Sequence, residues 1–63
     1  MNLRQLMNEC KNLESQLSEE CIIHAKSHAS KFAGSYFNRR KLEVYSDALW
    51  YELRVYGPVG GGQ

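Results

Sequence analysis

The feature that most constrains this fold is an apolar stripe at the start of an uninterrupted stretch of chain. Its members, spaced by three and four, are Leu3, Leu6, Cys10, Leu13 and Leu17. This spacing places side chains along one face of an α-helix. No glycine or proline occurs before Gly34. Asn2 is predicted to cap the helix, because its side-chain oxygen can accept a hydrogen bond from a free N–H of the first turn.

The stripe changes its spacing after Leu17, and two interpretations follow. In the favoured one, residues 2–33 form one long helix, and a stutter carries the stripe on through Cys21. In the other, the helix breaks at Ser18. Its hydroxyl would then cap a new helix with two glutamates in the first turn, where acids are favoured by the helix dipole.

A second helix is predicted over residues 39–56. Its stripe consists of Leu42, Tyr45, Leu49, Leu53 and Tyr56. A strand over residues 49–56 stays open as an alternative, because Tyr, Trp and Val favour strands. A turn is predicted at residues 34–38, and residues 57–63, with one proline and four glycines, are predicted to form a flexible tail. The predicted architecture is an all-α helical hairpin, with residues 1–56 as a single domain.

Small size makes self-association the expected source of extra stability. A chain of 63 residues buries only roughly 60% of its unfolded surface and usually needs a disulfide, a metal or a partner. A two-helix hairpin buries one stripe from each helix and leaves other apolar residues uncovered, so a second copy would complete a four-helix bundle. The predicted homodimer interface consists of Leu3, Leu6, Cys10, Leu13, Leu17, Val44, Tyr51 and Val55. The relative direction of the two copies is left open, and another protein could cover the same surface.

Charge is concentrated around the predicted turn. Residues 21–41 contain no acid, and their basic residues are Lys26, Lys31, Arg39, Arg40 and Lys41. Three bases at a helix start oppose the helix dipole, and a locally unfavourable choice can mark a functional site. An acidic partner surface or a phosphate would offset that cost, whereas the plainer interpretation is a solvated turn. The predicted partner-binding residues are Tyr36, Phe37, Arg39, Arg40, Lys41 and Trp50. A nucleic-acid-binding regulator using these bases is the alternative, although no recognition motif accompanies them.

Metal binding and catalysis are not expected. Cys21, His24 and His28 lie at steps of three and four on one helix face, and the alternative to no metal is a zinc site formed by these three residues. In the simpler interpretation Cys21 belongs to the apolar stripe, because buried cysteine behaves as a small hydrophobe. Two helices cannot easily build a water-excluding pocket with positioned catalytic groups. We therefore expect a non-enzymatic protein without a cofactor.

The expected location is the cytoplasm. No apolar run reaches the length of about 20 residues that a bilayer requires. The N-terminal segment carries Arg4, Glu9 and Lys11 where a secretory signal would have an apolar core. In that compartment Cys10 and Cys21 are expected to be free thiols.

The opening residues Met-Asn-Leu-Arg-Gln-Leu-Met, the helical body and the glycine-rich end resemble small early open reading frame products of lambda-like phages, including those of the exo–xis region, one of which has this length. The resemblance implies a dispensable early regulatory protein that acts by protein–protein interaction on its bacterial host, affecting the cell cycle or the choice between lysis and lysogeny. It carries over no binding or catalytic residues.

Overall fold

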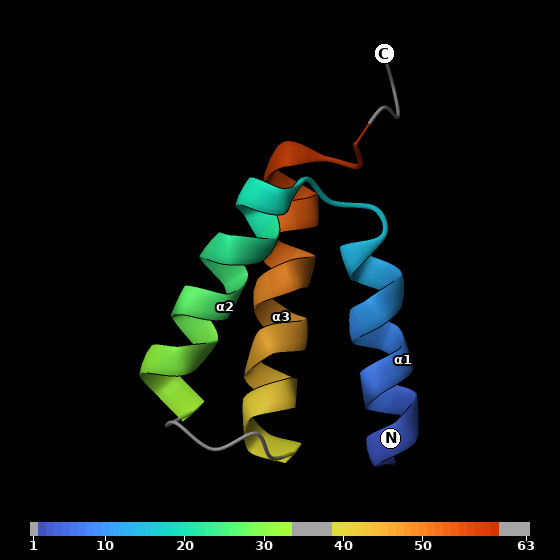
Figure 1. Cartoon of the computed structure of the whole chain (residues 1–63), viewed down its shortest axis with the longest axis vertical. Coiled ribbons are helices and arrows are strands. Elements are labelled where there is room, and N and C mark those ends of the chain that lie inside the picture. The colour runs from blue at the N-terminus through green and yellow to red at the C-terminus, as the bar shows by residue number, and fades with distance from the viewer. Residues whose placement is uncertain (1, 34–38, 60–63) are drawn as a thin grey trace.

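The computed structural model describes residues 2–33 and 39–59 and places three helices in them. These helices are α1 (Leu3–Glu14), α2 (Glu19–Ala33) and α3 (Arg39–Tyr56). The all-α class and the helix over residues 39–56 are confirmed, and the alternative of a strand over residues 49–56 is wrong. In Figure 1, α3 lies between the other two helices; α1 and α3 run in the same direction, and α2 runs in the opposite one. Within the described residues, no helix has the length and apolar character to cross a bilayer.

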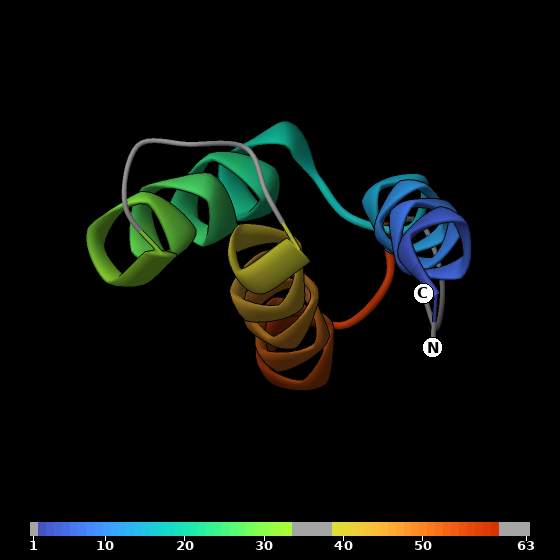
Figure 2. The same ribbon diagram turned by 90° about the horizontal axis from the view of Figure 1, so that it is seen from below.

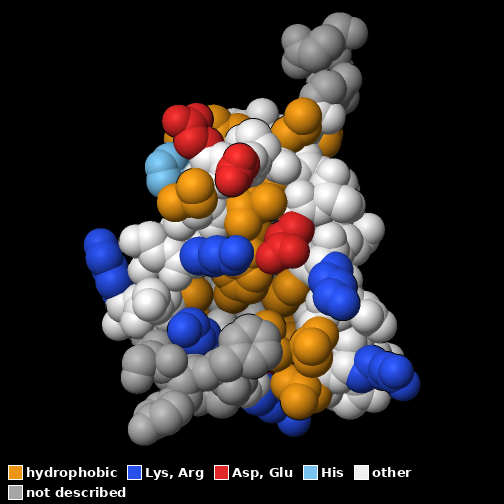
Figure 3. Space-filling view, in the orientation of Figure 1, with side chains coloured by type: hydrophobic (Ala, Val, Ile, Leu, Met, Phe, Trp, Pro, Cys, Tyr) orange, Lys and Arg blue, Asp and Glu red, His pale blue; other side chains and the backbone are white. Residues whose placement is uncertain are grey.

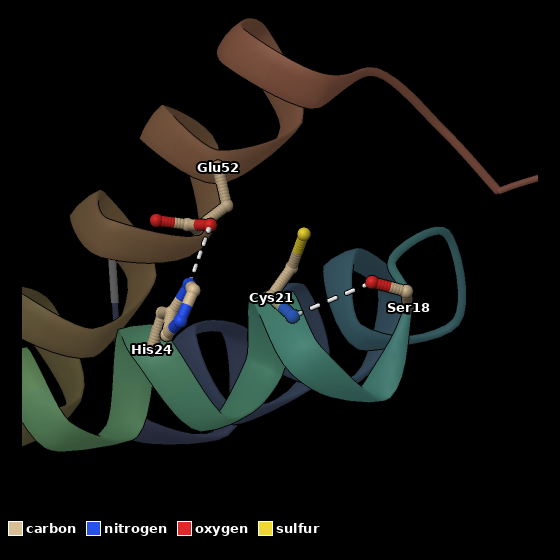
Figure 4. Close-up of polar contacts among 4 residues, drawn as sticks. All are labelled: Ser18, Cys21, His24 and Glu52. Carbon is tan, nitrogen blue, oxygen red and sulfur yellow. Dashed lines mark hydrogen bonds and ion pairs between the residues drawn. The ribbon is translucent and has the colours of Figure 1, made fainter.

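The predicted single helix over residues 2–33, and with it the two-helix hairpin, is wrong. At the end of α1 two hydrogen bonds span three residues and not the four of an α-helix. The Gln16 N–H donates to the Leu13 carbonyl at 3.0 Å, and the Leu17 N–H donates to the Glu14 carbonyl at 3.2 Å. Ser18 then caps α2, because its Oγ accepts a hydrogen bond from the Cys21 N–H at 3.4 Å (Figure 4). The second interpretation of the sequence, a helix break at Ser18, is the one that the structure confirms.

Helix length explains why the chain folds back. An unbroken helix over residues 2–33 would be about 48 Å long, whereas the 18 residues of α3 span about 27 Å. Much of the longer helix would find nothing to cover its stripe. After the break, α1 and α2 each pack against α3 and hardly contact each other, as the end-on view in Figure 2 shows. Both stripes are thereby buried within one chain.

The core lies on two sides of α3. Its buried members are Leu6, Cys10, Leu13, Leu17, Cys21, Ala25, Ala29, Leu42, Tyr45, Ala48 and Leu49. The members from α2 are Cys21, Ala25 and Ala29, small side chains one turn apart. Their small size allows α2 to approach α3 closely. His24 and His28 are exposed, so the buried face of α2 continues through Ala25 and Ala29 and not through the histidines.

The helix ends follow local chemistry. Asn2 accepts a hydrogen bond from the Gln5 N–H at 2.8 Å, and the Gln5 side chain accepts one from the Asn2 N–H at 3.0 Å, so the predicted cap is confirmed as a capping box. Gly57 ends α3 in the left-handed region with φ 79°, which glycine adopts without strain. The Val59 N–H then donates to the Gln16 carbonyl at 2.7 Å, which ties the end of α3 to the α1–α2 turn. The predicted turn at residues 34–38 and residues 60–63 of the predicted tail lie outside the described residues.

Replacement of the α2 cap gives a first test of the helix break. We expect Ser18→Ala to lower the free energy of unfolding by about 1 kcal/mol, because the Cys21 N–H loses its side-chain acceptor. Ser30→Ala, an exposed change within α2, is expected to leave stability unchanged or slightly raised, since alanine is the better helix former. Urea unfolding followed by circular dichroism measures both, and equal stability of the two variants would contradict the capping role.

Candidate interaction surface

Among the large side chains that α3 leaves exposed, three share one side of the helix; Tyr56, at the end of α3, is also exposed. Trp50 is 51% exposed, Tyr51 is 63% exposed and Val55 is 51% exposed. Asp47 and Arg54 lie between and beside them and are also exposed. We call Asp47, Trp50, Tyr51, Arg54 and Val55 the aromatic face of α3. Trp50, Tyr51, Asp47 and Arg54 line a shallow depression together with Leu53.

Trp50 is held in place by α1. Its indole N–H donates to Glu9 Oε2 at 2.6 Å, a bond that joins residues far apart in the sequence. The bond satisfies the one polar group of the ring and leaves the apolar part at the surface, a combination typical of interface tryptophans. A ring that is already oriented loses less conformational entropy when a partner covers it.

A second polar contact lies between α2 and α3. Glu52 is only 9% exposed, and its Oε1 accepts no hydrogen bond from a described residue. The nearest cationic candidate is His24, whose Nδ1 lies 3.8 Å from that oxygen (Figure 4). The contact becomes an ion pair only when the imidazole is protonated. Glu52 was not among the predicted site residues, because in the sequence it resembles any other acid on a charged helix, and only the position of α2 sets it apart.

The structure does not bring together the three residues of the alternative zinc site. Cys21 is buried in the core, whereas His24 and His28 are exposed. No group of three or more His, Cys, Asp or Glu side chains in the described part of the chain is arranged to hold a metal ion.

The cysteines are buried free thiols. Burial, with smaller contributions from the nearby Glu14 and Glu9 carboxylates, raises the pKa of Cys10 to about 11. Its nucleophilic thiolate is therefore scarce at neutral pH, which is the opposite of what a catalytic cysteine needs. Cys10 instead packs beside α3, with its sulfur 3.8 Å from the Leu42 carbonyl oxygen.

Two of the predicted partner-binding residues, Arg39 and Trp50, line one shallow hollow along α3, together with Glu9, Glu43 and Asp47. Arg39 and Arg40 are exposed at the start of α3, and Lys41 is partly buried. Arg39 Nε lies 3.6 Å from Glu43 Oε2, an exposed pair of the kind that adds little stability. Trp50 lies about 15 Å further along the helix axis from the basic residues. Tyr36 and Phe37 lie outside the described residues.

The predicted homodimer interface is divided in the structure. Leu6, Cys10, Leu13 and Leu17 are buried in the chain's own core and are not available to a second copy. Val44 is partly buried against that core, whereas Leu3, Tyr51 and Val55 are exposed. A two-helix hairpin would have left the buried residues for a second copy, whereas in the structure α1 has its own position beside α3, and they are buried there.

The opposite face of the molecule carries a different surface. In Figure 3, hydrophobic side chains gather along the middle of this face between α1 and α2, with Lys and Arg side chains on both sides. One hollow here, between α2 and α3, is lined by Lys26, Ala29, Ser30, Lys41, Leu42 and Tyr45. The Tyr45 hydroxyl donates a hydrogen bond to Glu14 Oε2, which links α3 to α1 beside this hollow. Three of the residues that line this hollow, Ala29, Leu42 and Tyr45, are buried in the core.

Comparison with known proteins adds no assignment to this geometry. The chain matches no protein-family model, no curated protein and no solved structure.

Proposed function

We propose that this chain is a small helical interaction protein, without catalytic activity of its own, that binds protein partners through the aromatic face of α3. The observation that carries the proposal is the adjacent pair Trp50 and Tyr51, both more than half exposed on a helix whose other side is fixed in the core. Trp and Tyr dominate the binding energy of protein interfaces. Two such rings beside Val55 form an apolar surface that a partner would stabilise by covering.

A second copy of the chain is the first partner that we propose. The copies would meet through α3, since much of the originally predicted interface is occupied within the monomer. The resemblance to early proteins of lambda-like phages supports a bacterial host protein as a further partner, in the cytoplasm, with effects on the cell cycle or on the lysis–lysogeny decision. Both partners would use the same exposed rings and would therefore compete.

Truncation of Trp50 tests this surface. We expect Trp50→Ala to weaken partner binding by at least about 30-fold, in line with the roughly 2 kcal/mol or more that a central interface tryptophan contributes. Truncation also removes the buried half of the ring and its hydrogen bond to Glu9, so urea unfolding is measured beside binding to show that the variant is folded. Ile23→Ala is the matched control, since Ile23 is an exposed apolar residue on α2. Sedimentation equilibrium measures self-association, and affinity capture from bacterial lysate compares the proteins held by each variant.

A protein captured by the wild type and by Ile23→Ala but lost with Trp50→Ala supports the aromatic face as a binding surface. Self-association and capture that are both unaffected by Trp50→Ala would refute it.

Nucleic-acid binding is the second candidate, supported by the basic residues of the 21–41 segment and the exposure of Arg39 and Arg40. Contacts to phosphates release counterions, so affinity for DNA or RNA would fall steeply as salt rises. Binding through the aromatic face would depend on salt far less. Titration of labelled duplex DNA and single-stranded RNA at two salt concentrations separates the two candidates.

A further inference from the structure

The charges on the aromatic face are arranged symmetrically about its two rings. Asp47 lies three residues before Trp50, and Arg54 lies three residues after Tyr51. The two residues are seven positions apart, close to two full turns, so they lie on nearly the same line along the helix, about 10 Å from each other. Both are exposed, and neither forms an ion pair with another described residue.

This arrangement is complementary to itself when reversed. Consider a two-fold axis that passes beside α3, between the two copies, perpendicular to the helix and level with the midpoint between Trp50 and Tyr51. The axis places Asp47 of each copy opposite Arg54 of the other, and it does so twice. Trp50 meets Trp50 of the other copy on one side of the line that joins Asp47 and Arg54, and Tyr51 meets Tyr51 of the other copy on the other side. A parallel pairing in register would instead oppose like charges.

We propose that a second copy of this chain docks on the aromatic face of α3 in an antiparallel orientation, with Asp47 of each copy paired to Arg54 of the other. This proposal rests on the proposed function and specifies its first partner. Charge complementarity favours a second copy over an unrelated protein, because the same face carries both halves of the match. In Figure 2, α3 projects on the side away from α1 and α2, so these two helices leave that side open to an approaching helix.

The expected association is weak and reversible. A single pair of helices about 27 Å long forms an interface at the small end of the range for specific complexes. We therefore expect a dissociation constant on the order of 10–100 µM, which calls for protein concentrations up to about 1 mM. Two charge pairs at a solvent-accessible seam are screened by salt, so association should weaken as ionic strength rises.

Charge reversal tests the register. Asp47→Arg opposes two arginines at both ends of the seam, and Arg54→Asp opposes two aspartates. We expect each variant alone to associate at least about tenfold more weakly than the wild type, because like charges in contact are strongly unfavourable. An equimolar mixture of the two variants should restore association to near the wild-type level, since every pair in the mixed dimer is again opposite in sign. Sedimentation equilibrium of each protein and of the mixture measures this.

A further mixture controls for net charge. The Asp47→Arg variant carries a formal charge of +3 and Arg54→Asp carries −1, against +1 for the wild type, so the two attract at long range. Lys11→Glu also carries −1, but its change lies on an exposed position of α1. Asp47→Arg mixed with Lys11→Glu should associate more weakly than Asp47→Arg mixed with Arg54→Asp. If either charge reversal unfolds the helix, the neutral variants Asp47→Asn and Arg54→Gln replace it. Self-association of these variants is expected to lose its dependence on salt concentration.

The outcomes separate this proposal from the proposed function. A wild type that stays monomeric to about 1 mM overturns docking of a second copy, while Trp50-dependent capture of another protein would still support the binding surface. A dimer that is insensitive to both reversals, or a mixture that does not restore association, overturns the antiparallel register. A dimer that is also insensitive to Trp50→Ala refutes the aromatic face as the site of self-association.

Discussion

The Leu49→Ala variant is expected to be only marginally stable at 37 °C, with a substantial unfolded fraction, whereas the wild type is folded. Leu49 is 0% exposed and lies on the central helix, where it belongs to the core cluster shared by α1, α2 and α3. Truncation of a fully buried leucine costs about 3 kcal/mol, through lost burial and the cavity left behind. A core of this size supplies only about 3–5 kcal/mol in total, so one such change removes most of the stability.

The matched control for this variant is Leu3→Ala, the same chemical change at a side chain that is 48% exposed. We expect it to cost well under 1 kcal/mol, because surface substitutions away from caps and cores have small effects. Thermal melting followed by circular dichroism, with urea unfolding of the more stable proteins, compares the three chains. Similar melting temperatures for Leu49→Ala and Leu3→Ala would show that α3 is not the centre of the core.

Raising the pH from 9 to 11 is expected to remove about 2 kcal/mol of stability through Cys10 alone. Burial, with smaller contributions from the Glu14 and Glu9 carboxylates, raises the pKa of this thiol from 9.0 to about 11 in the folded protein. The unfolded chain releases the proton first, so the stabilisation is fully present below pH 9 and is lost as the pH rises through the folded value. Each unit of pKa difference corresponds to about 1.4 kcal/mol.

Tyr45 extends the same effect to higher pH. Burial, together with the hydrogen bond to Glu14 and its negative charge, raises the pKa of Tyr45 well above its ordinary value. The folded state therefore retains the phenol proton under conditions in which the unfolded chain releases it. Stability from this group is present below the ordinary tyrosine pKa and is lost above it.

Two substitutions isolate these groups from the general titration of lysines. We expect the wild type to lose stability steeply between pH 8 and 10.5, and Cys10→Ala to start from a lower stability but to lose less of it over the same range. Tyr45→Phe should likewise flatten the loss at the upper end. Urea midpoints at pH 8, 9.5 and 10.5 measure the slopes. Parallel slopes for all three proteins would mean that neither group is protected from ionisation by the fold.

Some elements of the fold follow from neighbours along the chain. The helix over residues 39–56 was predicted with the bounds that the structure shows, because its apolar spacing and the glycine at its end act locally. The Asn2 cap is another local feature. Ser18 was recognised as a competing helix start, but the choice between one helix and two depends on what the second half of the stripe can pack against.

The composition of the candidate surface could not be read from apolar pattern alone. Tyr51 and Val55 were predicted at the dimer interface and Trp50 at the partner-binding site, and all three are exposed in the structure. The pattern also assigned Leu6 and Leu13 to an interface, although α1 buries them against α3. A stripe shows that a side chain needs cover, but it does not show whether the cover comes from the same chain.

The sequence by itself determined the helical class, the cap at Asn2, and the stripes that need burial, because these depend on interactions within a few residues. Only the tertiary structure decided the break after α1, the central place of α3, and the long-range contacts of Trp50 with Glu9 and of Glu52 with His24. The physical reason is one of scale. Caps and propensities contribute about 1 kcal/mol each, whereas burial of two complete stripes against one helix contributes several times more. The longer-range term therefore determines which side chains remain exposed to meet a partner.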